Sequence, residues 1–193
     1  MIKATIQYIN GKVEPLNYAE KLYGLCEIIV KGDKTFPAEY KSKGEYKQIN
    51  DFDKYNGVIY MRKNGDISIS DADNTLEACK SLSSVNTPLK MVVIVPRKKL
   101  DCDDNYSEDV IAQTIMRVLI TKSADFKVAL KARQARIQVD SYSTDSIAIM
   151  SGEYSNFGKK DINYKFAYLS IDISVIALVT HDCLTQDCYG VYS

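Results

Sequence analysis

Apolar and polar positions alternate with a period of two in several stretches of the chain, which is the pattern of half-buried β-strands. Residues 25–30, 35–40 and 45–49 are predicted to be short strands separated by short polar turns, so we expect them to form a meander. Residues 1–13 also alternate, which predicts a strand or an extended N-terminal arm. A further short strand is predicted over residues 147–150.

The pair Asn64-Gly65 gives the clearest local signal in the sequence. It separates two stretches that are rich in apolar and β-branched residues, residues 58–63 and 66–70. Both residues of an Asn-Gly pair tolerate positive φ, which a type I′ turn requires. We therefore expect the two stretches to pair with each other as a β-hairpin.

Two longer apolar stretches are expected to form the centre of the sheet. Residues 89–95 are largely apolar and β-branched and end at Pro96, a pattern typical of a strand buried on both faces. Residues 162–179 are long enough for one extended strand in which every second position is apolar, so one of its faces is predicted to be buried. The apolar side of this second strand consists of Ala167, Leu169, Ile171, Ile173 and Val175.

Helical spacing of apolar positions is strongest over residues 106–121. Asn105 and Glu108 resemble a capping box at the start of this helix, which we expect to lie on the sheet. Residues 124–135 show a weaker helical pattern that gives way to extended chain near its end.

Two further helices are expected in the first half of the chain. One begins near Pro15 and ends at Gly24, and a shorter one covers residues 75–82. Because helices and strands interleave irregularly, the predicted fold class is α+β: a mixed, mainly antiparallel sheet with a β-hairpin and two or three packed helices. Residues 1–193 are expected to form a single domain with an N-terminal arm and a C-terminal tail.

Composition limits the function more than the fold. The chain has 193 residues, with 25 basic and 25 acidic side chains and a formal net charge of zero. Such a chain has no bulk attraction for a phosphate backbone, so DNA binding is expected only from a local patch. The longest unbroken apolar runs, residues 91–95 and 175–179, are far shorter than the ~20 residues that span a bilayer, so an integral membrane protein is not expected.

The N-terminus and the cysteines indicate where the protein works. Residues 1–7 contain one lysine and no apolar stretch of the kind found in signal peptides, so we expect the chain to stay in the compartment where it is made. An odd number of cysteines spread along the chain favours free thiols in a reducing compartment. These cysteines are Cys26, Cys79, Cys102, Cys183 and Cys188.

Metal-ligating residue types gather at one place in the sequence, where the single histidine, His181, is close to Cys183 and Cys188. Imidazole and thiolate are ligands that zinc prefers, but closed zinc sites normally show paired short spacings that this segment lacks. A Cys-His nucleophile pair would also need a group that orients the base. We interpret the segment as a tail with ordinary thiols, and metal binding stays open as the alternative.

No other pattern predicts catalysis or a cofactor. Acidic residues gather at Asp51 and Asp53, at Asp71 and Asp73, and at Asp101, Asp103 and Asp104, but loops counted from Asp51 and from Asp101 lack the glycine and the glutamate of an EF-hand. The nine glycines form neither a dinucleotide-binding fingerprint nor a P-loop. The sequence therefore predicts no catalytic residue, no cofactor-binding residue and no metal-binding residue, and the chain is not expected to be an enzyme.

Two compositional features point to surfaces. Lys127, Lys131, Arg133 and Arg136 are placed to line one surface, which we interpret as a solvated face, with contact to DNA or to an acidic protein surface as the alternative. The chain also has 14 tyrosines and no tryptophan. Tyrosine is enriched in protein interfaces, but it is also a good strand former.

The order of these segments is similar to that of a known class of virion proteins. An early helix ends at YAEKLYG (residues 18–24), a meander contains FPAEY (residues 36–40), and a central strand and a helix precede the long strand YLSIDISV (residues 168–175). This arrangement, over most of the chain, resembles the head-tail connector, neck-ring or tail-terminator proteins of tailed bacteriophages, particularly crAss-like and other phages of Bacteroidota.

The resemblance implies a non-enzymatic structural protein of the virion, synthesised in the host cytoplasm. Identical subunits would form a ring between portal and tail, and the partners would be copies of the chain itself and portal, neck or tail proteins. No membrane partner is implied, and DNA would be contacted only through the lumen of the ring. A small cytosolic module that binds a protein or a ligand, and an enzyme without a recognisable motif, remain alternatives.

Overall fold

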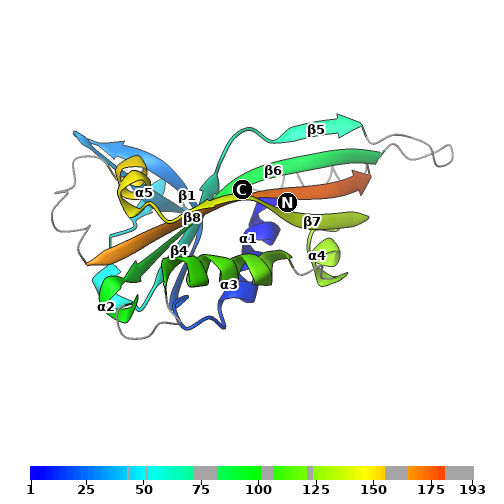
Figure 1. Cartoon of the computed structure of the whole chain (residues 1–193). Coiled ribbons are helices and arrows are strands. Elements are labelled where there is room, and N and C mark those ends of the chain that lie inside the picture. The colour runs from blue at the N-terminus through cyan, green and yellow to red at the C-terminus, as the bar shows by residue number, and fades with distance from the viewer. Residues whose placement is uncertain are drawn as a thin grey trace.

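The computed structural model describes residues 1–42, 44–50, 52–71, 82–100, 107–120, 124–154 and 165–180. In these ranges the chain has an α+β fold, with five α-helices and a mixed, mainly antiparallel sheet of eight strands (Figure 1). The predicted fold class is therefore confirmed. The strands are β1 (Lys21–Lys31), β2 (Lys34–Ser42), β3 (Glu45–Gln48), β4 (Val58–Lys63), β5 (Ser68–Asp71), β6 (Leu82–Pro96), β7 (Gln134–Ser143) and β8 (Phe166–Thr180).

A central pair of long strands, β6 and β8, runs through the whole sheet. They are antiparallel and paired at every position, from Leu82 with Thr180 to Pro96 with Phe166. Fifteen residues of strand span about 50 Å. The predicted buried strand at residues 89–95 is the second half of β6 and lies in the centre of the sheet, as expected, and the predicted long closing strand is β8.

The strands beside this pair divide the sheet into two ends. Across the sheet the order is β3-β2-β1-β4-β6-β8-β7, and β5 pairs with β6 beyond the part that β4 occupies. We call the part with β1 to β4 the proximal end. The part in which β5, β6, β8 and β7 lie in order is the distal end. β1 and β4 are parallel, whereas the other described strand pairs are antiparallel.

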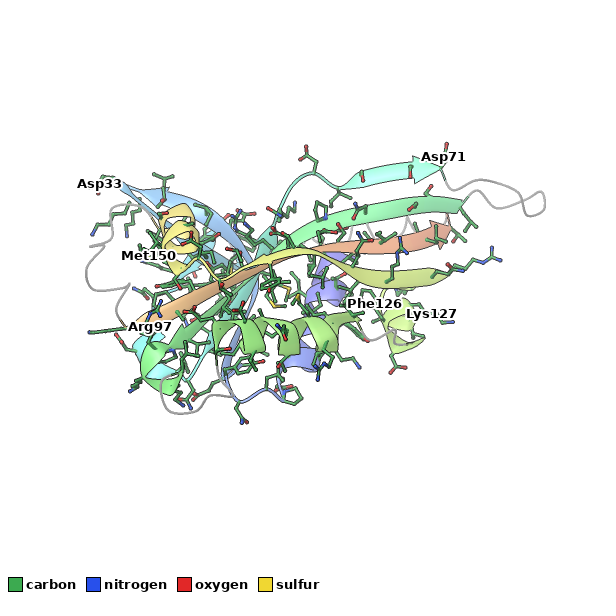
Figure 2. The ribbon with its side chains drawn as sticks, in the orientation of Figure 1. Asp33, Asp71, Arg97, Phe126, Lys127 and Met150 are labelled. Atoms are coloured by element: carbon green, nitrogen blue, oxygen red, sulfur yellow. The ribbon has the colours of Figure 1, made fainter. Side chains whose placement is uncertain are left out.

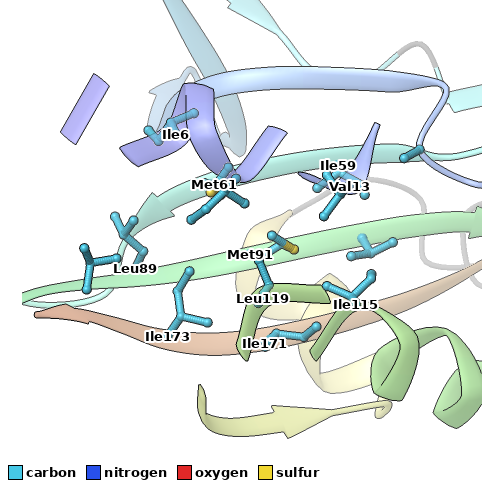
Figure 3. Close-up of a cluster of buried hydrophobic side chains, with 14 of the residues drawn as sticks. Ile6, Val13, Ile59, Met61, Leu89, Met91, Ile115, Leu119, Ile171 and Ile173 are labelled. Carbon is cyan, nitrogen blue, oxygen red and sulfur yellow. The ribbon is translucent and has the colours of Figure 1, made fainter. Parts of the chain in front are cut away.

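One face of the sheet is covered by helices along its length. The helices α1 (Ile2–Val13), α3 (Glu108–Ile120) and α4 (Ala124–Ala129) lie on this face (Figure 1). Their apolar sides meet the odd-numbered residues of β6 and β8 in the first core (Figure 3). Tyr8 of α1 stacks on Phe126 of α4, with ring centroids 4.6 Å apart, which joins two of the helices.

Among the described residues, the opposite face is covered only at the proximal end. There α5 (Ser146–Glu153) and a short 3-10 helix (Phe52–Lys54) pack on a second, aromatic-rich core, while the short helix α2 (Arg97–Leu100) follows directly after β6. Toward the distal end the same face carries polar and half-buried residues of β6 and β8, so that part of the sheet is open. These are Ser84, Asn86, Pro88, Ile176 and Leu178.

The predicted strand or arm over residues 1–13 is wrong, because this segment forms α1. Ile6, Ile9 and Val13 share the buried side of the helix. The segment carries both a period of two and a helical spacing, and the helical form buries its isoleucines against the sheet. The N-terminal segment is therefore part of the first core.

The predicted helix between Pro15 and Gly24 is also wrong. Residues 14–20 form turns, and β1 begins at Lys21. Tyr23 belongs to the second core, whereas Leu22 packs against the first core, so neighbouring residues are buried on opposite faces. Only a strand places adjacent side chains on opposite faces.

The predicted pairing of residues 58–63 with 66–70 does not occur. β4 and β5 both pair with β6 in the antiparallel sense, so they run in the same direction along one edge. Between β4 and β5, the backbone N–H of Asn64 donates to the carbonyl of Pro88 at 3.1 Å. Because Pro88 has no backbone N–H, it cannot donate the second hydrogen bond of a regular antiparallel pair to Asn64.

The remaining predictions have mixed outcomes. The meander is confirmed as β1, β2 and β3, and the helix over residues 106–121 is confirmed as α3, although Asn105 lies outside the described residues. The strand at residues 147–150 is wrong, because the segment lies in α5. The helix at 124–135 is shorter than predicted, since α4 ends at Ala129 and β7 follows. Residues 75–81 lie outside the described residues, and Leu82 begins β6.

Candidate functional site

The residues considered as metal ligands in the sequence, His181, Cys183 and Cys188, lie outside the described residues, so metal binding there stays an open alternative. Among the side chains that the structure describes, no group of three or more His, Cys, Asp or Glu could hold a metal ion. Cys26 is buried in the second core. Burial, with a smaller contribution from Glu39, raises the pKa of its thiol, so the thiol stays protonated and a poor nucleophile.

A buried polar cluster at the proximal end has the residue types of an active site. Glu153, at the end of α5, accepts hydrogen bonds from Tyr60 Oη at 3.1 Å and from Arg62 Nε at 2.8 Å. Its side chain is 3% exposed and that of Arg62 is 25% exposed. Burial, followed by the neighbouring Tyr154 and Glu153, raises the pKa of Tyr60 well above its ordinary value.

The contacts of this cluster indicate that it holds α5 on the sheet. Both carboxylate oxygens of Glu153 are used by residues of β4, so the charge is paired and bonded as a buried charge requires. Tyr154 Oη donates to the carbonyl of Ile49 at 3.0 Å. A substrate would find Tyr60, Glu153 and Tyr154 almost fully enclosed in this arrangement.

The start of α5 is fixed by a second set of buried bonds. Asp145 caps the helix by accepting from the N–H groups of Ile147 and Ala148. Ser146 Oγ accepts from the backbone N–H of Tyr168 at 2.9 Å and lies 3.3 Å from the carbonyl of the same residue, to which it donates. The Ser146 hydroxyl thus satisfies the backbone N–H and C=O of Tyr168 where a neighbouring strand would otherwise bond them. Asp145 and Ser146 therefore hold α5 and β8 in place, as Glu153 holds α5 on β4.

Acidic residues on the open face are tied to neighbouring strands. Asp172 of β8 accepts from Asn64 Nδ2 at 3.0 Å and from Ser141 Oγ at 2.9 Å, and Lys90 Nζ lies 3.6 Å from it. Asp140 of β7 accepts from Ser174 Oγ at 2.7 Å. These bonds connect β4, β6, β8 and β7, so the carboxylates act as cross-strand links.

The four basic residues of the predicted surface lie on α4, in the turn after it and at the beginning of β7. Lys127 lies on α4, Lys131 follows in a turn with φ of 51°, and Arg133 and Arg136 are exposed at the start of the strand. Figure 2 shows Lys127 at the same end of the molecule as Asp71. The predicted single surface is divided, because Lys127 lies on α4 on the helix-covered side, whereas Arg136 lies on the opposite face of the sheet.

The sequence did not indicate which strands of the sheet form its open edges. In the described part of the chain, β3, β5 and β7 each pair with one other strand only. Every residue of β5 is exposed, and Ile69 is 61% exposed. An unpaired edge offers backbone N–H and C=O groups to another chain. The signal for these edges was weak, because edge and central strands share the same periodicity.

A hollow of about 440 Å³ lies on the surface of α3 and is lined by Gln113, Met116, Arg117 and Ile120. All four residues come from one helix at helical spacing. The described part of its lining therefore lacks the converging polar groups from several elements that a small-molecule site requires.

No helix among the described residues is both long enough and apolar enough to cross a membrane. Comparison with known proteins adds no assignment: no protein-family model matches the chain, and no curated protein matches it either.

Proposed function

We propose that this chain is a structural protein that assembles with copies of itself into a ring. The observation that carries this proposal is the pair of open, exposed edges at the distal end of a sheet that runs through the molecule. The buried polar groups that would be needed for catalysis are used to hold α5 and the strands together.

The central strands β6 and β8 form a long, rigid part of the subunit, which would hold neighbouring subunits at a fixed distance. β6 and β8 are bonded along all of their length, and the first core covers one face of both. The side chains of Leu169, Ile171 and Ile173 are almost completely buried. A close-packed sheet of this kind deforms little, so contacts made at its edges would be transmitted through the subunit as a rigid body.

The open edges support association through two different surfaces. Contact between unlike surfaces produces a closed ring when the rotation between subunits permits it. β7 is ten residues long, and β5 is exposed at all four positions. Native proteins normally cover or shorten such edges, and a neighbouring subunit is one way of covering them.

The proposed location is the neck or tail connector of a tailed-phage virion, between portal and tail. This part of the proposal is supported by the resemblance in the order of segments. The partners would be further copies of the chain and portal, neck or tail proteins. A net charge of zero suits a ring through which DNA passes, because a basic lumen would hold the phosphate backbone.

Light scattering across a wide concentration series tests the proposed assembly, with electron microscopy of any large species. The expected result is a discrete mass that is a multiple of the subunit mass, and ring-shaped particles. A strict monomer at every concentration contradicts self-assembly.

The proposed location needs a separate test. Mass spectrometry of purified phage particles is expected to find peptides of this chain in a fixed ratio to the portal protein. Their absence from intact particles contradicts the virion location and leaves self-assembly to be judged on the scattering result.

A further inference from the structure

The two edges of the distal end carry opposite charge. Residues 64–71, which lead into and include β5, contain Asp66 and Asp71 and no basic residue. Residues 133–138, which lead into and include the start of β7, contain Arg133 and Arg136 and no acidic residue. We call these segments the acidic edge and the basic edge. Their charges favour contact between the acidic edge of one molecule and the basic edge of another.

Both edges are accessible in the described part of the chain. β5 is bonded to β6 alone, and β7 to β8 alone. The exposed side chains at the basic edge include those of Arg133 and Arg136. On the acidic edge, Asp66 and Asp71 are exposed.

The faces of the two edges also match. In β5, Ile69 lies opposite Val85 of the first core, so its side chain is on the helix-covered side of the sheet. In β7, Ala135 and Ile137 pack against the same core from that side. An extension of the sheet from β7 to β5 of another copy therefore brings Ile69 next to apolar residues.

The polar side chains of β5 and β7 also lie on one common face of the sheet. Ser68 and Ser70 lie opposite Asn86 and Ser84, on the open face of the sheet. The exposed residues Gln134, Arg136 and Gln138 of β7 lie opposite Leu178, Ile176 and Ser174 on that face. A one-residue slip would exchange the two sides, so this match selects a register.

The strand directions are compatible with a ring. β5 and β8 run in one direction, whereas β6 and β7 run in the other, because each neighbouring pair is antiparallel. When copies stand side by side in the same orientation, β7 of one copy is antiparallel to β5 of the next. The alternation of the distal end then continues from subunit to subunit.

We propose that β5 of one copy pairs in the antiparallel sense with the first half of β7 of the next copy, which forms the contact between neighbours in a ring; this inference rests on the proposed self-assembly. The occupant of each edge is a second copy of the chain. The pairing is short because β5 has four residues. Charge attraction and the burial of Ile69 therefore supplement the backbone bonds, and high salt weakens the contact.

Charge exchange in the full-length chain tests this contact. The acidic-edge variant carries Asp66→Lys and Asp71→Lys, and the basic-edge variant carries Arg133→Glu and Arg136→Glu. In each variant the two edges have the same sign, so the measured mass is expected to fall to that of the monomer. A variant with all four substitutions has opposite edges again, and its assembly is expected to return.

Two controls separate this contact from general effects of charge and from unfolding. Lys54→Glu with Lys99→Glu changes the net charge as much as the basic-edge variant does, at exposed positions of the proximal end, and is expected to assemble like the wild type. Circular dichroism melting verifies the fold of each variant. Where a reversal prevents folding, Asp66→Asn with Asp71→Asn and Arg133→Gln with Arg136→Gln replace it, and each is expected to weaken assembly.

The outcomes distinguish the contact from the function on which it rests. Assembly by the wild type, its loss in both edge variants and its return in the combined variant support the contact. Assembly that persists in folded edge variants overturns the contact while the proposed ring stands. A wild-type chain that is monomeric at every concentration overturns both.

Discussion

The proximal and distal ends of the sheet share the same two long strands but differ in how many faces they bury. At the proximal end Val92 and Ile94 of β6 and Tyr168 of β8 are buried in the second core. At the distal end the corresponding face presents Ser84 and Asn86, which are only partly buried. The change occurs near Lys90 and Asp172, which are paired in register and 3.6 Å apart as an ion pair.

This difference shows how one strand can serve two purposes. Odd-numbered positions of β6 and β8 are apolar along almost the whole length, and they hold the helices. Even-numbered positions of β6 change from apolar and buried to mainly polar, and those of β8 change from buried to half-buried, which ends the second core and leaves this part of the described sheet open. We expect the proximal end to provide the stability of the subunit and the distal end to provide its contacts.

Ile171→Ala against Ile176→Ala is the strongest test of this comparison. Ile171 is fully buried in the first core, whereas Ile176 is a half-buried residue of the open face in the same strand. We expect Ile171→Ala to lower the free energy of unfolding by about 4 kcal/mol, because it leaves a cavity in a packed core. Ile176→Ala is expected to cost about 1 kcal/mol or less. Equal costs in urea unfolding would show that the open face is covered in the monomer.

Glu153→Ala tests the buried cluster of the proximal end. The substitution leaves Arg62 without its carboxylate and Tyr60 without its acceptor. We expect the free energy of unfolding to fall by about 3 kcal/mol. This value is at the low end for a broken buried ion pair, because the Arg62 side chain is partly exposed to solvent. Urea unfolding measures the loss, and Glu14→Ala at an exposed glutamate is the matched control. A stable Glu153→Ala protein would argue against a role of this cluster in holding α5.

Alkaline pH is expected to destabilise the proximal end first. Burial raises the pKa of Cys26 above its ordinary value of 9.0, and burial also raises the pKa values of Tyr60, Tyr154 and Tyr168 above 10.0. Above these ordinary values the unfolded chain loses protons that the folded chain keeps. Stability is therefore full below pH 9 and then falls, by about 1.4 kcal/mol per pH unit for each group.

Hydrogen exchange at increasing pH provides the measurement, after correction for the intrinsic rate. Protection is expected to fall earlier in β4 and α5 than in the distal parts of β6 and β8. Tyr60→Phe removes one of the titrating groups and is expected to reduce the slope. Uniform loss of protection would show that the two ends unfold as one unit.

Asp145→Ala has a smaller expected effect, because it removes the cap of one short helix. Asp145 accepts from two backbone N–H groups at 3.1 and 3.0 Å. The expected cost is about 1 kcal/mol, and Asp145→Asn is expected to recover most of it because asparagine caps almost as well. Thermal melting compares the two variants. An equal loss in both would indicate that the negative charge matters more than the cap.

Ile69→Ser is expected to have the smallest effect on the subunit and a large effect on assembly. Ile69 is 61% exposed on β5, so its replacement is expected to change the free energy of unfolding by less than about 0.5 kcal/mol. The mass from light scattering is expected to fall. Val30→Ser, at a residue that is 71% exposed on β1 of the proximal end, is the matched control. A clear loss of stability in Ile69→Ser would place this side chain in the core of the monomer.

The sequence correctly predicted those elements whose apolar pattern fits only one type of secondary structure. Residues 89–95 are apolar at almost every position, and residues 106–121 repeat apolar residues at helical spacing over a long stretch. Both were found as β6 and α3. Residues 1–13 and 147–150 were assigned to the wrong element because short apolar patterns fit either period. Asp145 was the available signal for α5, since aspartate is a preferred cap.

The sequence by itself determined that β6 and β8 have a buried apolar side, that α3 is amphipathic, and that a basic group surrounds Arg133. These are local properties, fixed by side-chain period and charge. Only the tertiary structure decided that β4 and β5 follow each other along β6 without pairing, and that Glu153 meets Arg62. It also decided which strands are edges. Partners far apart in the sequence are selected by the packing of the whole sheet, and no local pattern specifies that choice.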